Sequence, residues 1–384
     1  MTPPNLDRLT TNKLIPAYER FGFQLLSQLA KQDRDKNVFI SPLSVAIALA
    51  MTYNGAQGTT KQAIAQVLGF DNLNLQDIQA INAANQSLLS MGDNLDAQIQ
   101  LAFANSLWLR QGISLNDDFV QQLQDFFQSQ VASLDFSDPD AATTINRWVA
   151  EKTQGKIQNL VTPDLIRAAI LLLINAIYFK GRWTRRFNKA STAKQPFHAP
   201  GSRCKHPMMT QSGRYRYCET DLFQAVSLPY GEGYVSLYVF LPKPSSSLAE
   251  FQTQLTSDNW QRWMVQFCET TGEIGLPRFT VEYEQSLNDA LIGLGMGEAF
   301  SEQANFASMG AGPLTISDVI HKAVIEVNEA GTKAAAATAV IMTRSAAPMS
   351  PFKMIVDRPF FHAIRDDRTG ALLFMGFVLN PAAK

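Results

Sequence analysis

Residues 329–340 read EAGTKAAAATAV, and residues 341–345 continue with IMTRS. Side chains this small allow a backbone to slide between neighbouring strands without displacing packed atoms, and Gly331 can act as a pivot because glycine tolerates almost any φ angle. The residues that follow are of a kind that serine proteases cleave. The pattern indicates a segment that moves. Four consecutive alanines are also strong helix formers, so a short exposed helix at residues 334–337 is the alternative.

The composition is that of a globular chain without specialised chemistry. Of the 384 residues, 46% are hydrophobic and 17% are charged, and the net charge of −1 argues against a dedicated nucleic-acid-binding protein. Cys204, Cys218 and Cys268 are odd in number and include no C-x-x-C pair, which favours packed thiols over a zinc site or a disulfide scaffold. We expect no metal and no cofactor.

The sequence predicts no membrane segment. Residues 1–12 are polar and lack the basic-then-apolar pattern of a secretion signal. The longest apolar run, residues 168–174, is far too short to cross a bilayer. We expect a soluble, cytoplasmic protein that does not bind membranes.

Hydrophobic periodicity changes from helical to extended along the chain. Tyr18, Phe21, Leu25 and Leu29 recur at helical spacing. Further helices are predicted at residues 42–51, 117–127 and 143–153, and strands at residues 98–109, 171–179, 225–228, 235–241, 272–283, 324–327 and 372–379. Because helices come first and no Gly/Ser/Pro linker interrupts the chain, we predict one α+β domain over residues 1–384.

Catalytic signatures are absent from the sequence. It contains no G-x-S-x-G elbow, no H-E-x-x-H and no G-x-x-x-x-G-K-[ST]. Residues 293–297 read GLGMG, which lacks the last glycine of a dinucleotide-binding fingerprint. We therefore assign no catalytic residue and expect a protein that is not an enzyme.

The charges are unevenly distributed. Between Lys180 and Tyr217 there are ten Lys or Arg residues and no Asp or Glu, whereas residues 62–109 contain no Lys or Arg. The basic block could attract an acidic partner or a polyanion. The simpler interpretation is a solvated hairpin whose neutralising acids come from elsewhere in the fold.

Six blocks of sequence, in the same order, resemble the serpin family over essentially the whole chain. They are NVFISPLS at 37–44 with GAQGTT at 55–60, INRWV at 145–149 with TQGKI at 153–157, NAIYFKGRW at 175–183, HKAV at 321–324 leading into residues 329–339, DRPF at 357–360, and FMGFVLNP at 374–381.

The resemblance implies a fold, a function and a mechanism. The fold has three β-sheets, about nine helices and an exposed reactive loop at about residues 329–350, in a metastable native state. A serine protease attacks the loop as a substrate, and the cleaved loop then inserts into the large sheet and traps the acyl-enzyme. Cross-reactivity with cysteine proteases is left open, and a non-inhibitory serpin acting as a binding or carrier protein is the alternative.

The family's hinge maps onto the opening stretch of small residues. Its members here are Glu329, Gly331, Thr332, Ala334, Ala335, Ala336 and Ala337. If Thr332 faces the core on insertion, a period of two places Lys333, the only charge after Glu329 in this stretch, on the exposed side. A non-inhibitory relative would be expected to carry a proline, a charge or a bulky residue at the early buried positions, and this chain has none.

Supporting roles follow from the same resemblance. Ser41, Ser44, Asn175 and His321 match the shutter, a polar cluster under the strands that must part. Trp183 matches the breach, where the loop enters. Ordinary core packing is the competing interpretation for all five residues.

The position of the cleaved bond is less tightly defined. Counting seventeen residues from Glu329 places the cut between Ser345 and Ala346, whereas counting sixteen places it between Arg344 and Ser345. We favour Arg344–Ser345, because arginine suits the acidic specificity pocket of a trypsin-like protease. An elastase-like or subtilisin-like target is also compatible with this loop.

The remaining expectations concern partners and departures from the family. We expect a monomer that binds no nucleic acid, and extracellular action is the family-based alternative to the cytoplasm. Residues 62–109 cover the helix that binds heparin in some relatives, so heparin activation is not expected at that surface. His362 stands where the family usually has a large apolar residue, which leaves the packing there uncertain.

Overall fold

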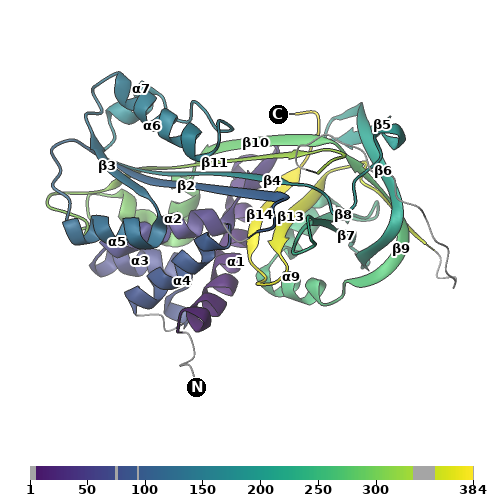
Figure 1. Cartoon of the computed structure of the whole chain (residues 1–384), viewed down its shortest axis with the longest axis horizontal. Helices are drawn as coiled ribbons and strands as arrows, with labels where there is room; N and C mark the ends of the chain where they lie inside the picture. Colours follow the sequence, from purple (N-terminus) through teal and green to yellow (C-terminus); the bar gives the residue numbers. More distant parts are fainter. Residues whose placement is uncertain (1–5, 74–76, 93–94, 332–350, 384) are drawn as a thin grey trace.

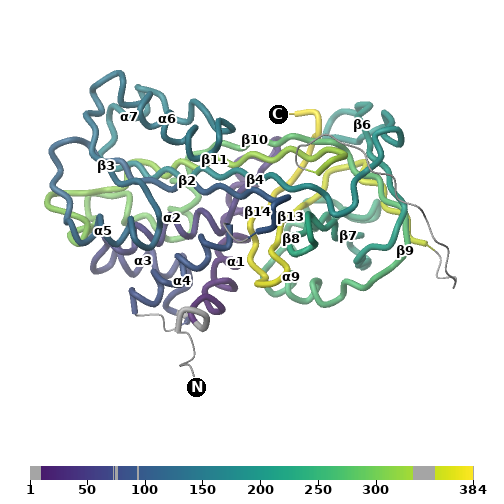
Figure 2. The backbone as a smooth tube through the Cα atoms, in the orientation of Figure 1, coloured from purple at the N-terminus to yellow at the C-terminus, as the bar shows by residue number. Residues whose placement is uncertain are grey.

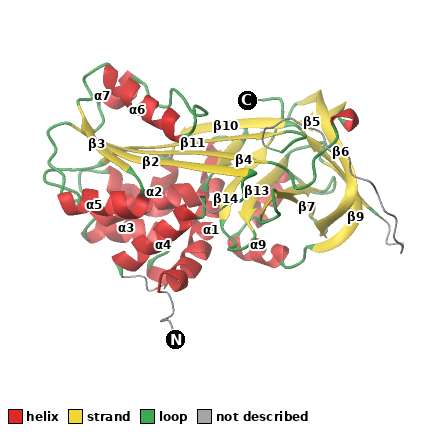
Figure 3. Cartoon of the chain, viewed as in Figure 1, coloured by secondary structure: helices red, strands yellow, loops and turns green. Residues whose placement is uncertain are grey.

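The computed structural model describes residues 6–73, 77–92, 95–331 and 351–383. Most of its helices lie at one end and along the lower side of the molecule, and the strands extend to the other end (Figure 3). The predicted α+β class is confirmed. The described residues form these helices: α1 (Leu6–Gln32), α2 (Pro42–Gly55), α3 (Gly58–Leu68), α4 (Ile78–Ser90), α5 (Asp117–Phe127), α6 (Asp140–Lys152), α7 (Pro163–Arg167), α8 (Leu248–Gln254), α9 (Ser257–Met264) and the single turn α10 (Asn288–Leu291).

Helix α2 begins and ends where the sequence predicts a helix boundary. The Ser41 hydroxyl accepts a hydrogen bond from the backbone N–H of Ser44 at 3.2 Å, and Pro42 occupies the first turn. Every residue of α2 is buried. Because it is apolar on all sides, the helix is surrounded by other elements, including α1, α5 and strand β4.

A five-stranded sheet crosses the centre of the molecule in the order β10-β11-β4-β2-β3 (Figure 1). Its strands are β2 (Ile99–Arg110), β3 (Gln130–Leu134), β4 (Leu171–Gly181), β10 (Phe279–Ser286) and β11 (Ile316–Val327). Strands β4 and β11 are parallel neighbours. Helices α6 and α7 cover one face and α2 lies under the other (Figure 1). Strand β4 is therefore buried on both faces, which explains its nearly continuous apolar sequence.

The other strands form one nine-stranded sheet in the order β1-β14-β13-β8-β7-β6-β9-β12, with β5 beside β6. They are β1 (Val38–Ile40), β5 (Ala193–Ala199), β6 (Ser202–Glu219), β7 (Phe223–Tyr230), β8 (Val235–Pro242), β9 (Cys268–Pro277), β12 (Phe352–Ile355), β13 (Phe360–Asp366) and β14 (Leu372–Val378). The first half of the long strand β6 pairs with β5, and its last four residues pair with β7. The second and third sheets expected from the sequence are thus joined through β6.

Two hydrophobic clusters hold the central sheet between them. The larger one includes α1, α2 and the nine-stranded sheet, with an aromatic group around Phe240, Trp260 and Phe361. The smaller one, around Ile145, lies between α6 and the outer face of the central sheet.

The two ends of the chain meet in the nine-stranded sheet. Strand β1 pairs with β14, and the register places Phe39 opposite Gly376. The Asn37 side chain accepts hydrogen bonds from the backbone N–H groups of Leu379 and Asn380 at 2.8 and 3.0 Å. In Figure 2 the purple N-terminal part of the chain lies beside the yellow strands from the C-terminal part. Segments from both ends of the described chain therefore contribute to the same sheet.

Three predictions about elements need correction. The strand predicted at 272–283 is two strands in different sheets, β9 and β10, separated at Arg278. The strand predicted at 324–327 begins eight residues earlier, at Ile316. The glycines at 293–297 lie in helical turns, η3 (Ile292–Met296) and η4 (Gly297–Phe300), preceded by α10 rather than by a strand. The arrangement of a dinucleotide-binding turn is therefore missing.

Other features of the described residues bear on the remaining expectations. No helix in this part of the chain is long and apolar enough to span a membrane. Within the same residues, no three His, Cys, Asp or Glu side chains are grouped as a metal site. All three cysteines are free thiols. The His362 ring is fully buried and lies parallel to that of Phe39, with 5.4 Å between the ring centres, so the strand packs around it.

Candidate functional site

The chain leaves β11 through a tight turn at residues 328–331. The backbone N–H of Asn328 donates to the Gly331 carbonyl at 3.0 Å, and the Gly331 N–H donates back to the Asn328 carbonyl at 3.1 Å. Gly331 has a φ of +118°. A Cβ atom at this position would collide with the carbonyl oxygen of Gly181 and the backbone nitrogen of Trp183. Glycine is therefore required both by the conformation and by the close approach to the end of β4.

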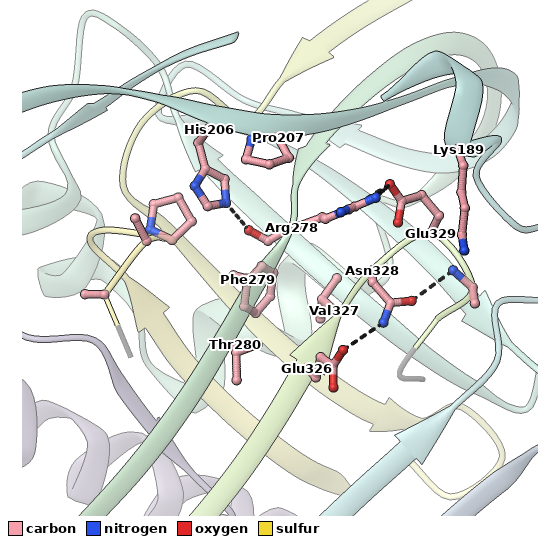
Figure 4. A pocket seen from close by; sticks show the side chains of 14 residues that line it. Lys189, His206, Pro207, Arg278, Phe279, Thr280, Glu326, Val327, Asn328 and Glu329 are labelled. Carbon is pink, nitrogen blue, oxygen red and sulfur yellow. Dashed lines mark hydrogen bonds and ion pairs between the residues drawn. The ribbon is translucent and has the colours of Figure 1, made fainter. Parts of the chain in front are cut away.

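Glu329 is anchored by side chains from other elements. Only 3% of its surface is exposed. Arg278, between β9 and β10, donates from Nε to Glu329 Oε1 at 2.7 Å and also from Nη2 (Figure 4). The Thr192 hydroxyl donates to the same oxygen at 2.6 Å. Burial alone would raise the pKa of Glu329, but these donors and the charge of Arg278 hold it below its ordinary value. The carboxylate is ionised and fixes the start of the loop segment against the sheet.

An open cavity of about 880 Å³ lies beside this anchor. Its walls come from β6, β10 and β11, from the chain near Lys189 and from the C-terminal residues (Figure 4). The His206 Nε2–H donates to the Arg278 carbonyl at 2.5 Å, and the Asn328 amide donates to Glu326 Oε1 at 3.1 Å. The cavity therefore adjoins the point at which the last described residues leave the sheet.

Trp183 lies at the end of β4, against the same turn. Its indole Nε1 donates to the Asn328 carbonyl at 2.8 Å, and its backbone N–H donates to the Ala330 carbonyl at 3.2 Å. The ring is 3% exposed and stacks on Tyr230, with 4.3 Å between the ring centres. The structure thus brings Trp183, Glu329 and Gly331 together, although the sequence separates Trp183 from the turn by more than 140 residues.

The ladder between β4 and β11 stops short of this turn. The last registered pair is Tyr178 with Val324, whereas β4 continues to Gly181 and β11 continues to Val327. The two neighbouring strands are therefore not paired with each other over their last three residues. This end of the β4–β11 seam is the one beside Trp183 and Glu329.

The other predicted residues meet further along the same seam. Asn175 on β4 lies opposite His321 on β11, and the His321 Nδ1–H donates to Asn175 Oδ1 at 2.6 Å. The Asn175 amide donates to Ser44 Oγ at 2.6 Å. The backbone N–H of Ser41 lies 3.4 Å from His321 Nε2, which accepts from it. Each ring nitrogen of His321 thus has one partner, as in a neutral imidazole.

Burial keeps this histidine neutral. All four side chains, Ser41, Ser44, Asn175 and His321, are fully buried. Desolvation lowers the pKa of His321 to about 3, far more than its hydrogen bond to Asn175 raises it. The cluster therefore connects β4, β11 and α2 through uncharged hydrogen bonds.

Asn105 is a member of this cluster that the sequence did not identify. It lies on β2, opposite Asn175 in the ladder, and its Oδ1 accepts from the Asn175 amide at 2.5 Å. A buried asparagine in a mostly apolar strand needs a partner, because an unpaired buried amide is costly. An asparagine at position 105, within an apolar stretch of sequence, was the feature that could have indicated this member of the cluster.

The rest of the predicted site cannot be placed. The hinge positions Thr332, Ala334, Ala335, Ala336 and Ala337 and the reactive-bond positions Arg344, Ser345 and Ala346 lie outside the described residues. Of the predicted hinge, the structure describes Glu329 and Gly331.

Comparison with known proteins gives a consistent family assignment. Residues 16–381 match the family model described as Serpin (serine protease inhibitor). Human neuroserpin is 34% identical, over 98% of this chain and 94% of that protein. The crystal structure of human thyroxine-binding globulin complexed with thyroxine superposes with a TM-score of 0.89 at 27% identity, covering 98% of this chain and all of that one. The native-state structure of tengpin, a thermophilic serpin, gives 0.87 at 31% identity, with coverages of 96% and 94%.

Proposed function

This chain belongs to the serpin family, and on that premise we propose that it inhibits serine proteases as a suicide substrate. The target protease attacks the loop after Glu329 and forms an acyl-enzyme. The cleaved loop then inserts between β4 and β11, carries the protease with it and stalls deacylation. The observation that supports this proposal best is the run of small residues at 332–339, which follows directly from an anchored turn at the unpaired end of the β4–β11 seam.

The sheet topology makes insertion favourable. Strands β4 and β11 are parallel. A loop that turns back after β11 would run antiparallel to both, so one parallel ladder would be replaced by two antiparallel ladders, which are slightly more stable per residue. About twelve inserted residues at ~1 kcal/mol net for each added hydrogen bond give on the order of 10 kcal/mol. That is comparable with the whole stability of an ordinary domain.

The side chains of the loop fit this destination. With Thr332 facing the core, the alternate positions buried on insertion are small or apolar, and Lys333 stays exposed. They are Ala334, Ala336, Thr338, Val340 and Met342. Insertion of residues 332–342 would therefore bury no charged side chain.

The bond that we propose is cleaved is Arg344–Ser345, with Ser345–Ala346 as the alternative. An arginine on the acyl side fits the acidic specificity pocket of trypsin-like proteases. Mass spectrometry of the fragments released from the reacted protein distinguishes the two positions, because the two cuts differ by one serine.

The mechanism is tested by incubating the protein with trypsin, elastase and subtilisin, followed by SDS gel electrophoresis. We expect a covalent complex that resists SDS with at least one protease. Complete loop cleavage by all three without any complex would contradict the proposal.

A second function is supported by one comparison. Thyroxine-binding globulin, whose structure is similar to this one, carries thyroxine in its crystal structure. A non-inhibitory binding protein on the same fold has no need of loop insertion, so cleavage of its loop would leave thermal stability unchanged. The absence of a proline, a charge or a bulky residue at the early buried positions favours the inhibitor.

A further inference from the structure

Two glycines lie opposite each other on strands β6 and β9. Gly213 on β6 is the register partner of Gly272 on β9, and the two strands run side by side (Figure 1). A Cβ atom on Gly213 would collide with the guanidinium of Arg185, and one on Gly272 would collide with the ring of Phe352. Because opposed residues share a face of the sheet, Arg185 and Phe352 cover neighbouring positions on the same face.

The two side chains come from segments that hold opposite ends of the loop. Arg185 belongs to residues 183–187, and the backbone N–H of Phe187 donates to the Glu329 carbonyl at 3.0 Å. Phe352 begins β12, where the chain rejoins the nine-stranded sheet after the loop. The segments at both ends of the loop therefore meet on the same patch of β6 and β9.

A chain of contacts through β6 joins these two segments. The ring of Phe352 packs edge-on against the ring of Tyr215, with 6.1 Å between the ring centres. The Tyr215 hydroxyl donates to Gln211 Oε1 at 2.9 Å, and the Gln211 amide donates to the Arg186 carbonyl at 2.6 Å. Arg186 directly precedes Phe187, whose N–H holds the turn. The contacts are continuous from β12 to the turn, as energetic coupling between two sites requires.

Arg185 adds a second link between the segments. Its Nη2 donates to the Ser212 carbonyl at 2.6 Å, and its guanidinium covers Gly213. Burial raises the pKa of Tyr215 to about 12, and the charge of Arg185 opposes this rise. Arg185 and Tyr215 are therefore close enough to interact.

Tyr217, two residues further along β6, holds β12 in a different way. Its ring stacks on that of Phe352, with 4.0 Å between the ring centres. Its hydroxyl donates to Glu219 Oε2 at 2.6 Å and accepts from the Gln224 amide at 2.8 Å. Neither of these partners belongs to residues 183–187. Tyr217 therefore contacts β12 without linking it to the turn.

We propose that Tyr215, Gln211 and Arg185 are positioning residues that couple the two ends of the loop, so that loosening β12 also loosens the turn at residues 328–331. The purpose of this coupling rests on the proposed function, in which residues 332–350 stay anchored at both ends until a protease cleaves them. Because both anchors share one cluster on β6, the intact loop is held in one arrangement, and the protease meets it in that arrangement.

Hydrogen–deuterium exchange of the intact protein, followed by mass spectrometry, tests the coupling. Phe352→Leu weakens β12 by removing the ring that contacts Tyr215. We expect the amides of β12 and those of residues 328–331 to exchange at least about fivefold faster, the lower end of typical coupling between sites. Met354→Ala is the matched control, because it weakens the same strand at a fully buried position and removes no ring. It should speed exchange in β12 alone.

Repeating Phe352→Leu in two further backgrounds tests the residues that carry the coupling. Tyr215→Phe with Arg185→Met, the relay variant, keeps the tyrosine ring but removes its bond to Gln211 and removes the guanidinium. Tyr217→Phe is the control background, because it also removes a tyrosine hydroxyl from β6. We expect Phe352→Leu to speed exchange at 328–331 fully in the control background and by less than about twofold in the relay variant. Melting temperatures close to that of the unmodified protein establish that both backgrounds are folded.

Each exchange measurement has an outcome that would overturn the proposal. Unchanged exchange at 328–331 in Phe352→Leu would exclude the coupling. An equal response to Met354→Ala would also exclude it, because the turn would then respond to any weakening of β12. Equal responses in the relay variant and in Tyr217→Phe would overturn the roles of Tyr215, Gln211 and Arg185.

The purpose of the coupling is tested separately, with a protease that the unmodified protein traps. We expect more inhibitor molecules to be cleaved per trapped protease in the relay variant than in Tyr217→Phe, because a loosely held loop is also cleaved in arrangements from which insertion starts late. Equal numbers would overturn this purpose. The exchange measurements need no protease, so a protein that traps none would contradict the proposed function and leave the coupling standing.

Discussion

Glu329 shows how one carboxylate can fix the beginning of a loop. It is buried, yet all its side-chain partners come from other elements, namely Arg278 and Thr192. The sequence identified Glu329 as a hinge residue but gave no indication of these partners, because Thr192 and Arg278 are 137 and 51 residues away. Only the folded sheet brings them together.

Replacing this carboxylate should destabilise the protein measurably. In Glu329→Gln, Arg278 loses its charge-assisted hydrogen bonds, and we expect a loss of about 2 kcal/mol in the free energy of unfolding. Urea unfolding at pH 7 measures it. Glu269→Gln removes an exposed ion pair and should cost well under 1 kcal/mol. The pKa of Glu329 is lower in the folded protein than in the unfolded chain. The carboxylate therefore contributes fully to the free energy of unfolding above the pKa of the unfolded chain, and this contribution is lost as the pH falls through the pKa of the folded protein. Equal stabilities of Glu329→Gln and Glu269→Gln would contradict the anchor.

The two buried histidines should make the fold sensitive to acid. Burial lowers the pKa values of His321 and His362 to about 3, from 6.5 in the unfolded chain. Between these values the unfolded chain binds protons that the folded chain does not, so stability falls with falling pH, by up to about 1.4 kcal/mol per pH unit for each histidine.

His362→Phe separates the two contributions. Phenylalanine can keep the stack on Phe39 and removes one of the two titrating rings. We measure the free energy of unfolding in urea at pH 7, 6, 5 and 4. In this variant we expect the part of its pH dependence that comes from the histidines to be about half as steep. An identical slope in His362→Phe and the unmodified protein would exclude His362 as an acid-sensitive group.

Thr332 tests the burial pattern of the proposed insertion. Thr332→Arg would place an unpaired charge on the core side of the inserted strand. We expect first cleavage by the target protease at an unchanged rate and loss of the SDS-resistant complex, so that the inhibitor becomes a substrate. Lys333→Arg is the matched control, because position 333 is assigned to the exposed side, and it should still form the complex. Complex formation by Thr332→Arg would refute the assigned burial.

At the scale of elements, hydrophobic periodicity predicted the helices and strands whose apolar residues follow a clear pattern. Helix α5 was predicted at its observed bounds, because its apolar residues fall on one face between a capping Asn116 and a left-handed Gln128. Strand β4 was predicted because it is apolar throughout. The basic block was interpreted as a solvated hairpin without strand bounds, because its exposed polar and charged residues hide any alternation and the pairing of β5 with β6 is visible only in space. The position of the site followed from family resemblance rather than from periodicity.

A reversible crosslink tests whether β4 and β11 must part. Ala176 and Lys322 are partners in the β4–β11 register, and neighbouring strands are about 4.8 Å apart, within the range of a disulfide. In a background with Cys204, Cys218 and Cys268 changed to serine, Ala176→Cys with Lys322→Cys should lock the seam when oxidised. We expect loop cleavage without complex, and recovery of the complex after reduction with dithiothreitol.

The single variant Lys322→Cys controls for the lost ion pair with Glu284. It should form the complex with the protease under both oxidising and reducing conditions. If the oxidised double variant still forms the complex, the loop does not insert between these two strands.

At the scale of the whole molecule, inhibition requires a native state that is not the most stable one. Strands β4 and β11 are paired up to Tyr178 and Val324, and their last three residues are not paired with each other. The small residues that follow Gly331 in the sequence could supply a strand between them. The polar cluster around Asn175 holds the seam closed through neutral hydrogen bonds. Under the proposed mechanism, the free energy gained from a new strand exceeds the free energy lost when these few hydrogen bonds break. The inserted state is then favoured, and what delays insertion is the opening of the seam.

Loop cleavage should therefore stabilise the protein even without a trapped protease. With on the order of 10 kcal/mol gained on insertion and an unfolding entropy that grows with chain length, a 384-residue domain should melt roughly 10–15 °C higher after cleavage. Differential scanning calorimetry of the intact and cleaved protein measures the shift. Cleaved Thr332→Arg is the control and should melt within a few degrees of its intact form, because its loop cannot insert without burying the charge. An unchanged melting temperature in the cleaved unmodified protein would show that no strand is added, and the non-inhibitory binding function would then be the better explanation of this fold.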